Sequence, residues 1–147
     1  GLVLIFTQGF LVGRLVKKMG ESLVTFWGII FITVGYIAVP LIEYVWFMIF
    51  VAGLIALGAG MYIPALNSLI SKNTSTGEQG ETFGIAQALI GLALVVAPVF
   101  GGILYDVFGS GSPFFAAAGV TLGALYFAGA VFKKLRHVEK RSFFWHR

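Results

Sequence analysis

Four long uncharged stretches dominate the pattern of hydrophobic and polar positions along the chain. No charged side chain occurs in residues 22–42, 44–71, 82–105 and 107–132. A helix needs about 20 mostly apolar residues to cross a hydrocarbon core of roughly 30 Å, and each stretch is long enough. Backbone that faces lipid must satisfy its own hydrogen bonds, so the crossing segments should be helices. The pattern predicts an all-α, polytopic membrane helix bundle. Its expected spans are residues 22–42, 45–70, 83–105 and 113–132.

The first apolar segment is too short to cross a bilayer. Residues 1–13 reach only about 20 Å at ~1.5 Å per residue. No basic segment precedes them, and the sequence begins with Gly1 rather than Met, which argues against a signal peptide. We therefore expect residues 1–13 to be the second half of a truncated transmembrane helix and the sequence to be a C-terminal fragment.

The basic residues occupy alternate breaks between the spans. All ten lie in residues 14–21, at Lys72 or after residue 132, whereas the breaks at Glu43 and Asp106 have none. This positive-inside asymmetry predicts a cytoplasmic loop at 14–21 and a cytoplasmic tail at 133–147, in an integral protein of the cell (inner or plasma) membrane. Topology thus explains the net charge of +4, and no nucleic-acid partner is expected.

Small and polar residues recur every three or four positions in the second and third spans. Gly60, Pro64 and Asn67 share one face of the second span, and Gln87 lies on a similar line in the third. Close helix packing is the simpler interpretation of each small residue, because lipid offers little other drive for association. An amide in an apolar helix needs a polar partner, which a helix, a water-filled cavity or a solute would supply. These four residues are therefore candidates for a substrate pathway.

The spans lack the side chains that catalysis, metal binding or proton transfer would require. None contains a charged residue, and His137 and His146 both lie in the tail. The absence of Cys removes thiolate ligands and nucleophiles. We expect no enzyme activity, no catalytic residue, no metal and no cofactor. Protons are a candidate coupling ion, whose titrating group would lie in a part of the protein before this sequence.

Two polar segments lie outside the predicted spans. In residues 71–82, Ser75 with Glu78 and Thr76 with Gln79 each have the spacing of a capping box, which predicts the start of the next helix. The tail ends in aromatic residues among basic ones, which suits an anchor at an anionic inner leaflet and equally a frayed, solvated end.

Three motifs resemble the major facilitator superfamily, in particular its twelve-helix drug/proton antiporter branch that includes the tetracycline exporters. Residues 7–21 (TQGFLVGRLVKKMGE) are similar to the family's loop between helices eight and nine. Residues 58–71 (GAGMYIPALNSLIS) are similar to its tenth helix. Glu78-Gln79-Gly80 and residues 97–102 (APVFGG) resemble the start and the kink of its eleventh. The resemblance implies that the chain runs from the end of helix eight through helix twelve, with the tenth helix lining a central cavity.

The resemblance also assigns roles to individual loop residues. The family's loop motif is Gly-x-x-x-Asp-Arg-x-Gly-Arg, and Gly13, Lys18 and Gly20 match it; with Arg14 they are implied to act in gating. Lys17 replaces the Asp and Glu21 replaces the final basic residue. A charge pair made by that Asp therefore does not transfer to this chain.

Pro98, Gly101 and Gly102 form the kink that the resemblance implies. Proline removes a helical hydrogen bond and permits a bend. The family's antiporter motif, which belongs to its fifth helix, has Gly before the proline, whereas Ala97 stands here. The similarity therefore supports an internal pseudo-repeat and gives no support to antiport.

The expected function is secondary active transport, with efflux of a small organic solute or drug by alternating access. The expected partners are the lipid bilayer, that solute and the missing N-terminal half of the same protein. The alternative is a non-transporting, membrane-embedded structural or interaction subunit, which the lack of intramembrane charge would also fit.

Overall fold

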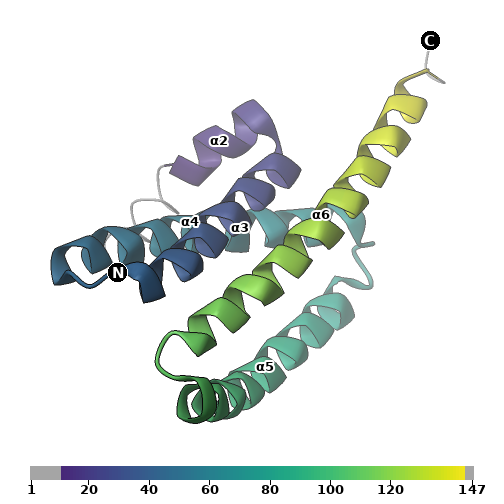
Figure 1. Ribbon diagram of the computed structural model, residues 1–147. Helices are drawn as coiled ribbons and strands as arrows, with labels where there is room; N and C mark the ends of the chain where they lie inside the picture. Colours follow the sequence, from purple (N-terminus) through teal and green to yellow (C-terminus); the bar gives the residue numbers. More distant parts are fainter. Residues whose placement is uncertain (1–10, 145–147) are drawn as a thin grey trace.

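A computed structural model describes the backbone of residues 11–144 and the side chains of residues 11–132. All regular elements of this part are helical (Figure 1). In chain order they are α2 (Val12–Met19), α3 (Glu21–Ala38), η2 (Val39–Leu41), α4 (Val45–Asn73), α5 (Gln79–Phe108) and α6 (Ser112–Phe144). The prediction of a truncated helix at residues 1–13 falls almost entirely outside the described residues.

Four of the described helices are long and apolar enough to cross a membrane. They contain the candidate spans Glu21–Leu41, Val45–Asn73, Gln79–Phe108 and Ser112–Phe132. The prediction of an all-α polytopic bundle is therefore confirmed. The helices extend beyond most of the hydrophobic stretches from which the spans were predicted, because hydropathy marks where lipid begins and not where a helix ends.

The segment predicted as a cytoplasmic loop, residues 14–21, is mostly helical. Residues Val12–Met19 form α2, a short and strongly amphipathic helix with Lys17 and Lys18 in its last turn. Leu11, Leu15 and Met19 follow at helical spacing, so a helix is the conformation that gathers them on one face. Only the junction at Gly20 separates α2 from α3.

The predicted break at residues 71–82 is also mostly helical. The α4 helix continues to Asn73, and α5 begins at Gln79. At the end of α4 the side chains of Asn73 and Thr74 donate hydrogen bonds to the carbonyl oxygens of Leu69 and Ile70, at 2.8 and 2.7 Å. These bonds satisfy carbonyl groups near the helix end, so the helix extends past the last apolar residue.

The last segment likewise continues a helix. The backbone of α6 runs without a break to Phe144, through most of the predicted tail. The two interpretations of that tail, a leaflet anchor and a frayed end, concern side chains outside the described residues.

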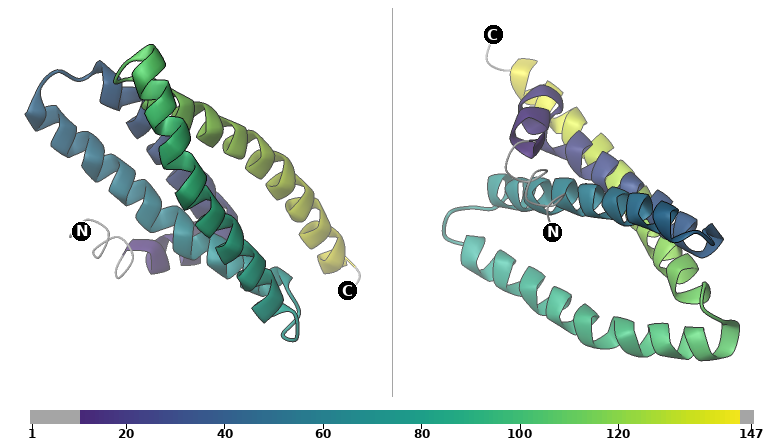
Figure 2. Two further views of the ribbon diagram at one scale, coloured as in Figure 1. Left: turned by 90° about the horizontal axis from the view of Figure 1, so that it is seen from below. Right: turned by 90° about the vertical axis from the view of Figure 1, so that its left-hand side faces the viewer.

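The core of the described part lies between α3 and α4, with α6 packed across α3. Val24 of α3 and Ala65 of α4 are each only 1% exposed, and Ala118 of α6 is 3% exposed. Figure 2 shows α5 running away from α4 after the turn that joins them and returning to the other helices through α6. The described residues thus form a tight α3–α4 pair with α6 against it, and an outlying α5.

Candidate functional site

The α3 and α4 helices cross at two glycines. A Cβ atom on Gly28 would lie 2.8 Å from the carbonyl oxygen of Gly58, and one on Gly58 would lie 2.6 Å from the carbonyl oxygen of Gly28. Such contacts are too short for any side chain, so the crossing requires glycine on both helices. Small residues are the usual means by which helices in lipid come this close.

Two buried threonines of α3 are satisfied within their own helix. Thr25 and Thr33 are 1% and 3% exposed. Their hydroxyl groups donate to the carbonyl oxygens of Glu21 and Ile29, at 2.9 and 2.8 Å. Back-bonding of this kind lets a hydroxyl be buried without a partner on another helix. These polar side chains therefore belong to packing.

An ionic cluster joins the beginning of α3 to the end of α4. The Lys72 ammonium group donates a hydrogen bond to the Glu21 carboxylate and forms a salt bridge with it. The Ser68 hydroxyl donates to the same carboxylate oxygen, at 3.3 Å. The Glu21 side chain is 16% exposed and that of Lys72 is 64% exposed, so the pair lies at the edge of the bundle. We call this edge the Glu21 end.

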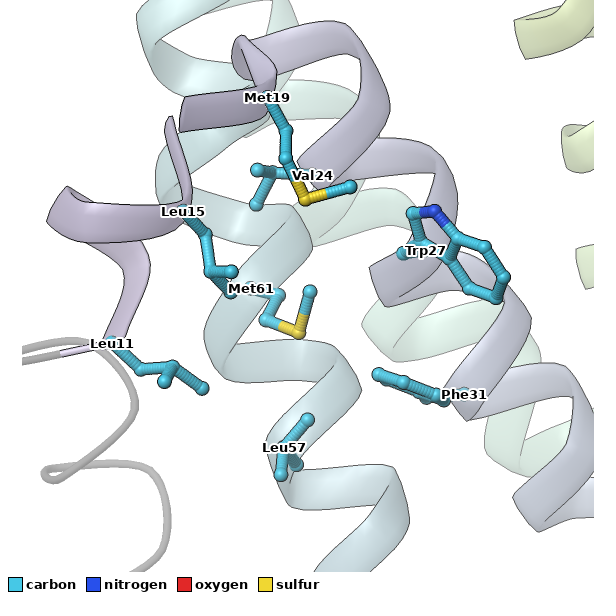
Figure 3. A pocket seen from close by; sticks show the side chains of 8 residues that line it. All are labelled: Leu11, Leu15, Met19, Val24, Trp27, Phe31, Leu57 and Met61. Atoms are coloured by element: carbon cyan, nitrogen blue, oxygen red, sulfur yellow. The ribbon is translucent and has the colours of Figure 1, made fainter. Parts of the chain in front are cut away.

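An apolar pocket opens beside this cluster, between α2, α3 and α4 (Figure 3). Its volume is about 280 Å³. Its lining residues, all of them apolar in type, are Leu11, Leu15, Met19, Val24, Trp27, Phe31, Leu57 and Met61. Trp27 and Met19 remain 44% and 38% exposed, which leaves the pocket open to its surroundings.

The four predicted pathway residues are not gathered into one site by the described part of the chain. Gly60 is buried, Pro64 is half-buried, and Asn67 and Gln87 are exposed. Asn67 is in α4 and Gln87 in α5, two helices that have little contact with each other. Any role of these residues in a common pathway therefore requires elements that are not among the described ones.

The loop-motif residues lie on α2 and at its end. Gly13, Arg14 and Lys18 are exposed on α2. Gly20 has a φ of +83°, a conformation that side-chain-bearing residues rarely adopt, and its N–H donates to the carbonyl oxygen of Val16 at 2.8 Å. Gly20 therefore ends α2 and allows the chain to turn into α3.

The turn between α4 and α5 shows that the predicted capping boxes do not form. The N-cap of α5 is Glu78, and its side chain makes no cap hydrogen bond. Instead, the Ser75 hydroxyl donates to the Glu78 carboxylate at 2.8 Å. The Gln79 amide donates to the carbonyl oxygen of Ser71 at 3.1 Å, which ties α5 to the last turn of α4. The capping boxes predicted an N-cap at Ser75 or Thr76, but the helix begins two to three residues later, with Glu78 as its N-cap.

The predicted kink lies within a continuous helix. The α5 helix contains Pro98 and continues to Phe108. Pro98 and Gly102 are exposed, Gly101 is half-buried, and a Cβ on either glycine would meet nothing within 4 Å. Among residues 11–132, no group of three or more His, Cys, Asp or Glu side chains could hold a metal ion.

Comparison of the sequence with protein families identifies the family of the chain. A protein-family sequence model described as Major Facilitator Superfamily matches residues 1–145, nearly the whole chain. The chain belongs to the Major Facilitator Superfamily. The resemblance inferred from the motifs is thereby confirmed, and the described helices are part of that superfamily's helical bundle.

Curated members of the superfamily show similarity over most of the chain. A proton-coupled antiporter flippase LtaA of Staphylococcus haemolyticus is 29% identical over 80% of the chain and 30% of its own length. A class G tetracycline resistance protein of Vibrio anguillarum is 27% identical over 84% of the chain and 29% of its length. A class B tetracycline resistance protein of Escherichia coli is 26% identical over 72% of the chain and 26% of its length.

The chain thus spans less than a third of the length of these superfamily members. No solved structure shows significant similarity to the chain.

Sequence reasoning missed the ionic cluster of this superfamily member. It noted that Glu21 replaces a basic residue of the loop motif, but it proposed no partner. A signal was present: Glu21 begins one span and Lys72 ends the next, so antiparallel helices place both at the same membrane edge. Only the crossing at Gly28 and Gly58 sets the rotation of the helices that brings the two side chains together.

Proposed function

We propose that the chain forms the last helices of a secondary active transporter that exports a small organic solute or drug by alternating access. The match of residues 1–145 to the Major Facilitator Superfamily is the observation that carries this proposal. Relatives named as a proton-coupled antiporter and as tetracycline resistance proteins support both the export direction and protons as a coupling ion. The same family membership favours a non-enzymatic transporter over a structural subunit.

The proposed pathway runs along the small and polar faces of α4 and α5. Gly60 and Pro64 shape the α4 wall, and Asn67 and Gln87 provide amide groups that can donate hydrogen bonds to a solute or accept them from it. The exposure of both amides supports this role, because neither is enclosed by the described helices. Transport in this proposal also requires the preceding helices that the longer relatives possess.

The proposed gate and hinge lie outside this wall. Gly13, Arg14, Lys18 and Gly20 form the gating segment at α2. Pro98, Gly101 and Gly102 allow α5 to bend as the two halves of the transporter rock about a central site. The placement of basic residues supports a cell-membrane protein with the Glu21 end and the C-terminus in the cytoplasm.

Transport by the complete protein, produced from its full reading frame, tests the proposal. Efflux of tetracycline and of a set of other amphiphilic drugs would be measured in inverted membrane vesicles with an imposed proton gradient. Asn67→Ala and Gln87→Ala should each lower the transport rate of an accepted drug about three- to tenfold, the value of one lost hydrogen bond. Ile63→Ala, a change at an exposed apolar position of α4, serves as the control.

Two results would contradict the proposal. Flux of an accepted drug through the isolated 147-residue chain would show that the preceding helices are not needed. Unchanged transport by both amide variants at normal expression would assign Asn67 and Gln87 to packing.

A further inference from the structure

The apolar pocket at the Glu21 end has the shape and the surroundings of a lipid site. It is bounded on one side by Leu11, the N-cap of α2, and by Leu15 and Met19 of α2, and on the other by residues of α3 and α4 (Figure 3). The transport pathway proposed above does not use any of its lining residues. A pocket of about 280 Å³ with only apolar side chains offers no group that would orient a polar solute.

The position of the pocket along α3 matches one leaflet of a bilayer. The candidate span of this helix begins at Glu21, and Phe31 is the pocket residue of α3 that lies farthest from that end. At ~1.5 Å per residue these positions are about 15 Å apart along the helix axis. Half of a hydrocarbon core of roughly 30 Å is the same distance. An acyl chain of the adjacent leaflet therefore has the length to follow the pocket.

The charges of α2, the helix that forms one wall of the pocket, favour an anionic headgroup. The α2 helix contains Arg14, Lys17 and Lys18 and no acidic residue, and both lysines are exposed. Glu21, the nearest acidic side chain in the sequence, is engaged by Lys72. Cations at a membrane surface attract anionic lipids, and an amphipathic helix presents them at headgroup level.

We propose that this pocket binds one anionic phospholipid. One acyl chain lies between α2, α3 and α4, and the phosphate group is held by Lys17 and Lys18 of α2. The proposal does not depend on which solute is transported, since none of the residues that line the pocket belongs to the proposed pathway. Lys18 of the proposed headgroup site also belongs to the proposed gating segment.

Trp27 provides a local readout because its ring lies in the pocket wall. The full chain would be reconstituted with Trp46→Phe and Trp145→Phe, which leaves Trp27 as its sole tryptophan. Quenching of Trp27 by phosphatidylglycerol with brominated acyl chains, mixed into phosphatidylcholine vesicles, gives the relative affinity of the two lipids at the pocket. We expect a preference for phosphatidylglycerol of about tenfold that falls as salt is added.

Two pairs of variants test the contact with the headgroup and the contact with the acyl chain separately. Lys17→Gln with Lys18→Gln should bring the lipid preference close to one, whereas Lys133→Gln with Lys134→Gln, the same change of net charge elsewhere, should keep it. Leu57→Phe fills the pocket and should lower the phosphatidylglycerol affinity several-fold, whereas Ile63→Phe on an exposed position of α4 should not. Helix content by circular dichroism confirms that each variant folds.

Several outcomes would overturn the proposal. Equal quenching of Trp27 by both lipids in the parent would exclude an anionic site. A preference that survives the double lysine variant would exclude α2 as the headgroup contact. Full affinity in Leu57→Phe would exclude the pocket and leave only a basic surface. Absence of quenching by any brominated lipid would show that protein covers the pocket.

Discussion

The α3–α4 pair and the α5 helix have equally hydrophobic sequences but opposite surroundings. In its most hydrophobic window, α3 has a third of its residues buried within the chain, whereas α5 has none. Glycine accounts for part of the contrast. Gly28 and Gly58 bring α3 and α4 into backbone contact, while Gly91 and Gly102 of α5 have open space around them.

Small residues in a membrane helix therefore show that another helix can approach closely. They do not show which helix does so. An apolar helix surface is about equally stable against lipid and against another apolar helix. Composition alone therefore does not determine which helix it packs against. In α3 and α4 the partner is within the chain. For α5, the glycines would be explained by helices of a longer transporter, such as those that make up the rest of the relatives' length.

The largest expected effect comes from breaking the α3–α4 contact. Gly58→Ala places a methyl group against the Gly28 carbonyl oxygen, so the helices must separate. We expect a loss of about 1–3 kcal/mol in the free energy of unfolding, the range for overpacked sites. Unfolding in mixed micelles of dodecyl maltoside and sodium dodecyl sulfate, followed by tryptophan fluorescence, measures it.

Gly53→Ala is the matched control on the same helix. A Cβ there meets nothing within 4 Å, so the change should be neutral or stabilise α4 by up to about 1 kcal/mol through helix propensity. Equal effects of the two substitutions would mean that the Gly28–Gly58 crossing contributes nothing to the stability of the pair.

These positions show how far the sequence could predict the fold. The absence of charge over long stretches was sufficient for the four spans, because the cost of burying charge in lipid is large and acts on each helix separately. The capping boxes were wrong, and the helix α2 within the predicted loop at residues 14–21 was not foreseen, because polar composition does not distinguish a surface helix from an irregular turn. The partner of Glu21 depends on the rotation of two helices about their axes, which no single-helix pattern contains.

The candidate pathway is less determined by the sequence than the spans are. Spacing placed Gly60, Pro64 and Asn67 on one face, and the structure shows different exposures along that face because α3 covers only part of α4. Packing against α3 explains the burial of residues such as Gly58 and Met61, which leaves the more exposed Asn67 as the stronger candidate for a role beyond packing.

A smaller effect is expected from the ionic cluster at the Glu21 end. Glu21→Lys or Lys72→Glu places like charges together, and the double exchange restores an opposite pair. Since Lys72 is largely exposed, water and salt weaken the interaction, and we expect a coupling free energy of about 0.5–1 kcal/mol at low salt. The four proteins of a double-mutant cycle, unfolded in the same micelles, measure it.

One outcome of the same double-mutant cycle would contradict the prediction. If the double exchange is no more stable than the sum of the single changes predicts, the cluster does not stabilise the α3–α4 pair. Glu43→Lys makes an equal change of charge at the opposite end of α3 and α4, and it should leave the stability of the Glu21 end unchanged.

The smallest effect within the chain, and the sharpest test of the contrast, comes from α5. Gly102→Ala meets nothing within 4 Å, so the isolated chain should keep its stability or gain up to about 1 kcal/mol. If helices of a complete transporter pack against this face, the same substitution should destabilise the complete protein by about 1–3 kcal/mol, as Gly58→Ala does in the chain. Micelle unfolding of both proteins gives the two values.

A change of sign between the two values would show that α5 is covered by protein in the complete transporter. Equal values would show that its glycines face lipid and that the open space around them is the native state.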